Sequence, residues 1–282
     1  MLKFSKEDNA KLKSIKEWSP IKEPKVYSIS LLSGFSCSFA SDCQTYAVEN
    51  KITKKRKVVD GKKAKYRCFS AIQETQYDNT YNQRKHNLDS ILAIRNDVEK
   101  ITDLIMDSLE NPVDENNLNS LPKNADYIRV HVGGDFVTSE YMLAWFNVAR
   151  IYPNIKFYAY TKAIGWMQDN EDMRAKNFRM IASVGGKQDH LIIKLSLSQK
   201  FLNIVRSKKQ VETITANVVF HPSETKLPID TNEFYAINDK RSFFNPSGSF
   251  SLLLHGTQKA GSEGSKALSR MNKENIKYSY SR

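Results

Sequence analysis

Three cysteines are the residues of this chain whose chemistry is easiest to specify. Cys37, Cys43 and Cys68 all follow the first expected strand and precede a long amphipathic helix. Thiolates that converge at the end of a strand can bind zinc, if His86 or His131 supplies a fourth ligand, or an iron–sulfur cluster with one open iron. The alternative is three independently buried cysteines, because free cysteine is among the most buried residue types. Their odd number disfavours a disulfide framework, so the thiols are expected to be reduced.

A glycine-rich turn is the second candidate site. Gly133, Gly134 and Asp135 directly follow an expected strand, and residues without a side chain let a ligand approach the backbone closely. The Asp135 carboxylate can then bind an amine or a hydroxyl of that ligand. The alternative is an ordinary strand-to-helix turn in which Asp135 caps the next helix.

Two single residues at other expected strand ends are candidate catalytic groups. Lys162 can hold a carboxylate or a phosphate as a point charge, although it can equally be solvated. His255 is the histidine best placed for function, because the sites of parallel sheets lie beyond the carboxyl ends of the strands. A structural histidine that bonds a loop is the alternative at that position.

The positive charge of the chain is concentrated in one segment. The chain has 43 Lys and Arg against 31 Asp and Glu, a formal net charge of +12. Residues 51–67 hold nine of the basic residues and one acidic residue, so this segment carries +8. It is either a nucleic-acid contact or a solvated loop or hairpin. Tyr46, Tyr66 and Phe69 flank it, which fits either base stacking or ordinary packing. The side chains expected to contact nucleic acid or another polyanion are Lys54, Lys55, Arg56, Lys57, Lys62 and Lys63.

A repeating β/α pattern must position these residues. Apolar residues spaced three and four apart over 87–109 predict a long amphipathic helix. The segment 127–161 predicts a strand over 127–132, a helix over 139–151 that ends before Pro153, and a second strand over 156–161. This is the order of a parallel crossover. Further strands are expected at 26–32, 178–184, 216–220 and 250–254. The sequence therefore predicts an α/β fold, a single domain with a parallel sheet, and a partial (β/α)6 barrel is one form of that fold.

The expected domain organisation is simple. We expect a basic arm over residues 1–24, the α/β domain over 25–270 with the basic segment as an insertion, and a polar tail over 271–282. No apolar run approaches the roughly 20 residues that a membrane span requires, and the first residues lack the apolar core of a signal peptide. We therefore expect a cytoplasmic protein without a membrane partner.

Six segments in order along the chain carry a family resemblance. They are LSGFSCSFASDC, YRCFSA, IRVHVGGDFVTSEYMLAWFNVARIYPNIKFYAYTK, MIASVGGKQD, KLPIDTNEFYAI and SFSLLLHGTQKAGSEGSKAL. Together they cover most of the chain from about residue 31 to 270, and they resemble the uncharacterised phage family named after gene product 88. This resemblance implies a phage protein that works in the host cytoplasm, but it implies no activity.

A more distant resemblance is to the radical S-adenosylmethionine barrels. In those enzymes three cysteines after the first strand hold a four-iron cluster, and a Gly-Gly-Glu turn after the second strand receives the amino group of S-adenosylmethionine. The resemblance implies that Cys37, Cys43 and Cys68 hold a 4Fe-4S cluster and that the turn at 133–135 binds the cofactor. The spacing differs, because five and then twenty-four residues separate the cysteines here, instead of three and two.

The residues support two functional classes. As an enzyme, the chain holds a cluster that passes an electron to S-adenosylmethionine on the turn at 133–135, and the basic segment presents a nucleotide or nucleic-acid-related substrate. As a non-enzymatic module, it is an α/β protein, stabilised by zinc or free of metal, that binds nucleic acid with an affinity that falls steeply with salt. What the three thiols hold discriminates between the two classes.

Overall fold

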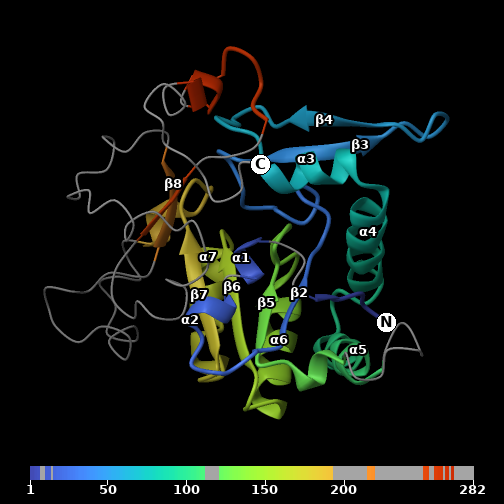
Figure 1. Cartoon of the computed structure of the whole chain (residues 1–282), viewed down its shortest axis with the longest axis vertical. Coiled ribbons are helices and arrows are strands. Elements are labelled where there is room, and N and C mark those ends of the chain that lie inside the picture. Colours follow the sequence, from blue (N-terminus) through green and yellow to red (C-terminus); the bar gives the residue numbers. More distant parts are fainter. Residues whose placement is uncertain are drawn as a thin grey trace, which may run out of the picture.

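The structure, a computed structural model, is built around one open, mostly parallel sheet (Figure 1). It describes residues 1–6, 10–13, 15–111, 121–192, 215–219, 250–253, 257–262, 264–266 and 268–269. The strand order is β1-β2-β5-β6-β7-β8-β9, and only the pairing of β1 with β2 is antiparallel. The strands are β1 Ser5–Lys6, β2 Val26–Ile29, β5 Tyr127–Val130, β6 Lys156–Thr161, β7 Phe178–Ser183, β8 Thr215–Val219 and β9 Phe250–Leu253. The predicted α/β class and parallel sheet are confirmed, whereas a barrel form of the sheet stays a prediction.

The helices connect and cover these strands. They are α1 Ala10–Lys13, α2 Ile15–Trp18, α3 Phe69–Gln76, α4 Asp78–Leu92, α5 Val98–Glu110, α6 Ser139–Ile151 and α7 Ile164–Asp169, with the 3-10 turns η2 Pro122–Asn124 and η3 Glu171–Met173. The helix predicted as one element over 87–109 is in fact parts of α4 and α5. The chain turns between them because Asp97 caps α5, with its carboxylate accepting a hydrogen bond from the Lys100 amide at 3.0 Å. None of the helices among the described residues has the length and apolar character that crossing a bilayer demands.

Different helices cover the two faces of the sheet. Neighbouring residues of a strand point to opposite faces, and on β6 Phe157 joins the larger core while Tyr158 joins the smaller one. Helices α5 and α6 supply the larger core, in which Phe157 stacks on Phe178 with ring centroids 5.8 Å apart. Leu12 and Ile15, from α1 and α2, cover the other face. Because both faces are covered, every residue of β2 and β5 is buried, as is typical of parallel strands.

The basic segment forms a hairpin outside the main sheet. Strands β3 (Thr45–Glu49) and β4 (Arg56–Asp60) pair only with each other, and the turn between them includes Lys54 at φ 56°. Helix α3 packs against this hairpin, whose tip reaches away from the other elements in Figure 1. Near its other end lies a C-terminal segment, because the Arg67 amide donates to the Gln258 side chain at 2.7 Å. Of the two local alternatives for residues 51–67, loop or hairpin, the structure has the hairpin.

Candidate functional site

The three cysteines lie on two segments that meet at the carboxyl edge of the sheet. Cys37 and Cys43 belong to the loop between β2 and β3, and Cys68 is the residue immediately before α3. All three are free thiols. This edge of a parallel sheet is where the sequence predicted chemistry, because the loops that follow the strands converge there.

The structure brings the three thiols close to one another and to Asp135. The pKa of the Cys37 thiol is raised well above its usual value by burial, and then by the negative charges of Asp135, Cys68 and Cys43. Burial also raises the pKa of Cys68, to about 12, and the charge of Cys43 adds to this effect, whereas the amides of Ala71 and Ser70 oppose it. Because Cys37 responds to the charges of Cys43 and Cys68, and Cys68 responds to the charge of Cys43, the three residues form one cluster. Metal binding to Cys37 and Cys68 must release their thiol protons.

No group of three or more His, Cys, Asp or Glu residues in the described part of the chain is arranged to hold a metal ion. Each of the two candidate fourth ligands uses one ring nitrogen in another contact, since His86 Nε2 lies 2.9 Å from the Met1 carbonyl oxygen and His131 Nε2 lies 3.2 Å from the Tyr141 hydroxyl. His131 Nδ1 is buried and has no hydrogen-bond partner among the described residues.

The cysteine loop is tied to the end of β7. Ala40 forms an isolated antiparallel bridge with Gly186, and the amide of Asp42 donates to the Gly185 carbonyl at 2.9 Å. Gly185 has φ 92°, and a Cβ there would lie 3.2 Å from the Asp42 Cβ, so the close approach favours glycine. The ring of Phe39 also packs edge-on against Trp166, with centroids 4.8 Å apart. The loop therefore reaches from β2 across the sheet edge to β7.

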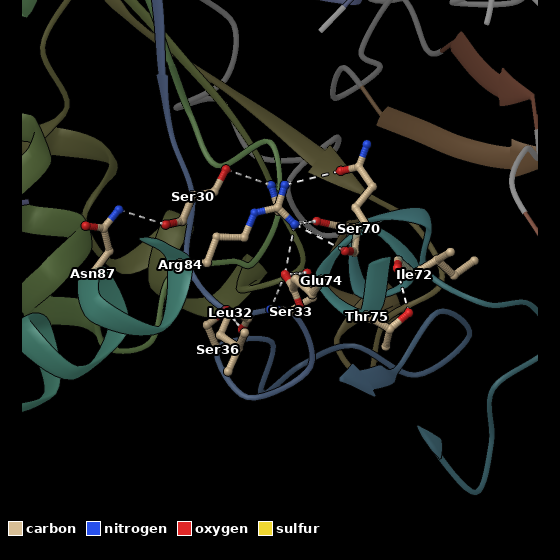
Figure 2. A network of polar contacts seen from close by, with 12 residues as sticks. Ser30, Leu32, Ser33, Ser36, Ser70, Ile72, Glu74, Thr75, Arg84 and Asn87 are labelled. Atoms are coloured by element: carbon tan, nitrogen blue, oxygen red, sulfur yellow. Dashed lines mark hydrogen bonds and ion pairs between the residues drawn. The ribbon is translucent and has the colours of Figure 1, made fainter. Parts of the chain in front are cut away.

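A buried ion pair holds both cysteine segments together (Figure 2). Arg84 Nη1 donates to Glu74 Oε1 at 2.9 Å and to the Ser70 hydroxyl at 2.6 Å, while Glu74 accepts from the amide and the hydroxyl of Ser33. Ser33 precedes Cys37 in the same loop, and Ser70 lies in the first turn of α3, next to Cys68. Burial raises the pKa of Glu74 even though the Arg84 charge opposes this shift. Sequence reasoning missed this pair because no local spacing links the two residues.

The glycine turn fits tightly between these segments. Gly134 has φ 87°, and a Cβ there would lie 2.8 Å from the Leu31 carbonyl oxygen and 2.6 Å from the Ser36 hydroxyl. A Cβ on Gly133 would overlap the Ser70 hydroxyl and lie 3.0 Å from Arg84 Nη1. Glycine is therefore required at both positions for the turn to pack against these residues, whether or not the turn binds a ligand.

Asp135 joins β5 to β6 and does not cap the next helix. Its Oδ1 accepts from the Thr161 hydroxyl at 2.7 Å and the Phe136 amide at 2.8 Å, and its Oδ2 accepts from the Lys162 amide at 2.8 Å. The cap of α6 is Thr138, so the predicted capping alternative is not what the structure has. A carboxylate has about four acceptor positions, so Oδ2 keeps an unused acceptor position.

The structure describes one of the two candidate catalytic residues, Lys162. Lys162 is 7% exposed, and its Nζ donates to the Ser183 hydroxyl at 2.7 Å and the Val184 carbonyl at 2.6 Å. It is therefore not solvated but connects the ends of β6 and β7, and it would have to give up these bonds to hold an anion. His255 lies outside the described residues.

The basic side chains do not form one uniform set. Lys54, Lys55, Lys57, Lys62 and Lys63 are exposed. Arg56 instead points into the protein, where its side chain is 7% exposed, its Nε donates to the Glu74 carbonyl at 2.8 Å, and its guanidinium lies 4.6 Å from the Tyr81 ring centre. It also pairs with Glu49 and Asp78. Arg56 anchors the hairpin to α3 and α4, so it is not available for the phosphate contact predicted for it.

One buried aromatic residue adjoins the thiols. Tyr66 is 8% exposed, and its hydroxyl is hydrogen-bonded to Cys43. Burial and then the charges of Cys43 and Cys68 raise the pKa of Tyr66 well above its usual value. Of the two alternatives for Tyr66, base stacking or packing, the structure therefore has packing, next to the cysteine cluster.

The comparisons with known proteins agree with the predicted family. A family model described as gene product 88 matches residues 2–272. No curated protein and no solved structure matches the chain. Since the matched region spans almost the whole chain, the protein belongs to the phage gene product 88 family.

Proposed function

We propose that this protein is an iron–sulfur enzyme of the radical S-adenosylmethionine type. The observation that carries the proposal is the convergence of Cys37, Cys43 and Cys68 beside Asp135 at the carboxyl edge of the sheet. Three thiolates are the donor set for a 4Fe-4S cluster with one open iron. When bound, the cluster would supply the electron that cleaves the cofactor.

The residues of the chain would bind and orient the cofactor. Oδ2 of Asp135, in the turn at 133–135, would accept a hydrogen bond from the amino group of S-adenosylmethionine. Burial of Asp135 raises the pKa of its carboxyl, and a cationic ligand group at that position would oppose this shift. Such a cluster requires a reducing compartment, which agrees with the expected cytoplasmic location.

Metal and sulfide analysis on protein purified without oxygen tests this proposal. We expect iron and sulfide with a brown absorption after reconstitution, and loss of both in each of the variants Cys37→Ala, Cys43→Ala and Cys68→Ala. Ser38→Ala is the matched control, because Ser38 is an exposed residue of the same loop. Colourless protein, or iron content equal in the control and the cysteine variants, would overturn the proposal. Stoichiometric zinc would instead support the non-enzymatic alternative.

Cofactor binding gives a second readout. Asp135→Asn keeps the size of the side chain and an acceptor oxygen for Thr161, but it removes the charge that would bind the amino group. We expect the variant to retain its cluster and to bind S-adenosylmethionine more weakly by equilibrium dialysis, by about 10-fold or more, as the loss of a charge-assisted hydrogen bond implies. Equal affinity in the two proteins would remove Asp135 from the proposed site.

A further inference from the structure

We propose that the outward face of the β3–β4 hairpin, together with Phe35, binds single-stranded nucleic acid. The inference of binding is argued only from the residues of this surface. The inference that the bound nucleic acid is also the substrate rests on the proposed function. Three features of the described residues carry the inference: the division of the hairpin into two faces, an exposed aromatic contact, and a set of lysines without acidic partners.

The hairpin presents one face to the protein and one to solvent. Side chains alternate along each strand, and the register pairs Tyr46 with Val59 and Val48 with Lys57 on one face. The opposite face carries Arg56, which is bonded to α3 and α4. The face with Tyr46, Val48, Lys57 and Val59 is therefore the outward one, and Val48 and Val59 are 37% and 38% exposed.

An exposed aromatic side chain lies at one end of this outward face. Phe35 is 50% exposed, and its ring meets Tyr46 edge-on with centroids 5.1 Å apart. Gly34 permits this contact, because it has φ 76° and a Cβ there would collide with the Tyr46 ring and the Thr45 carbonyl. The fold thus holds the Phe35 ring half exposed at the surface, and nucleic-acid bases stack on exposed aromatic rings.

Lysines without acidic partners surround the outward face. Lys54 lies 3.8 Å from Glu49, a weak surface pair. The exposed lysines that form no ion pair with any described residue are Lys51, Lys55, Lys57, Lys62 and Lys63. Positive charge next to a stacking surface is the combination that binds single strands without sequence preference.

This surface is continuous with the cysteine site. Phe35 stands two residues before Cys37, and Tyr46 stands three residues after Cys43. A base stacked on Phe35 would therefore lie beside the loop that carries the two thiols. From this placement we infer that the substrate of the proposed enzyme is a single-stranded nucleic acid or one of its nucleotide units.

Fluorescence anisotropy with a dye-labelled single strand of about 16 nucleotides, as DNA and as RNA, tests the binding. Phe35→Ala should weaken binding roughly 10-fold, because stacking on one base is worth about 1–3 kcal/mol. Neutralising Lys55, Lys57 and Lys62 to Gln should reduce the slope of log affinity against log salt by about 2, at roughly 0.7 per phosphate contact. The matched control neutralises Lys22, Lys123 and Lys176, which are exposed at the opposite edge of the sheet, and should leave the slope unchanged.

Three outcomes would overturn the inference. They are no binding by the unaltered protein, equal loss in the hairpin and control lysine variants, and polyglutamate binding as tight as that of nucleic acid. The last result would identify an acidic protein surface as the partner. Cys37→Ala protein should still bind the strand, so failure of the iron–sulfur proposal and failure of this inference are distinguishable. Circular dichroism of Phe35→Ala checks its folding, which should persist because this side chain is half exposed.

Discussion

The buried pair of Glu74 and Arg84 makes the sharpest prediction about stability. Glu74→Gln keeps the size of the side chain and one acceptor oxygen, but it leaves the Arg84 charge without its negatively charged partner. The side chains of Arg84 and Glu74 are 6% and 0% exposed, so water has little access to that charge in the folded protein. The same substitution weakens the bonds that Glu74 accepts from Ser33, and so loosens the loop before Cys37.

The structure sets the magnitude of this effect. Removing one partner of a buried ion pair costs about 3–5 kcal/mol, because the remaining charge is left desolvated. Removing both partners should cost less than removing one of them. The raised pKa of Glu74 agrees with this expectation, because the desolvation of its carboxylate outweighs the attraction of Arg84. A loss of this size is a large part of the roughly 5–15 kcal/mol by which a domain is stable.

Urea unfolding of the full chain, followed by tryptophan fluorescence, measures the change. We expect Glu74→Gln to lower the free energy of unfolding by about 3 kcal/mol or more, and the double variant Glu74→Gln/Arg84→Met to recover part of it. Asp89→Asn is the matched control, because it breaks the exposed pair with Lys85 on the same helix and should cost at most about 1 kcal/mol. Equal losses for Glu74→Gln and Asp89→Asn, or a double variant less stable than the single one, would refute the reasoning.

Two further changes test the packing around the glycine turn. Burial and the Arg129 charge lower the pKa of His131 from 6.5 to about 3, so the folded protein holds it neutral. Its contribution to stability is complete above pH 6.5 and is lost as the pH falls toward 3, which predicts a loss of about 2 kcal/mol by pH 5 that His131→Asn should abolish in urea titrations. Gly133→Ala should cost about 1–3 kcal/mol through overlap with the Ser70 hydroxyl. Ser70→Ala should recover part of that cost in the double variant, and simple addition of the two losses would contradict the overlap.

Much of the fold could be predicted from local sequence pattern. Strand β6 and helix α6 have the predicted bounds, because alternation of period 2 and spacing of three and four directly reflect which side chains each element buries. The end of α4 was missed, although Asp97 directly before Val98 is a local signal for the start of a new helix. The apolar residues before and after that turn continue the same spacing of three and four. Periodicity alone therefore cannot show where the helix is interrupted.

The candidate site depended on contacts between distant residues. The sequence by itself determined the residue types, the order of the elements and the carboxyl edge at which loops converge. Only the tertiary structure decided that the hairpin folds out on α3 and so brings Cys68 back to Cys37 and Cys43. It also turned Arg56 inward and gave the Lys162 ammonium its partners at the end of β7. The physical reason is that burial and pairing of a charge depend on groups far along the chain, which no local pattern encodes.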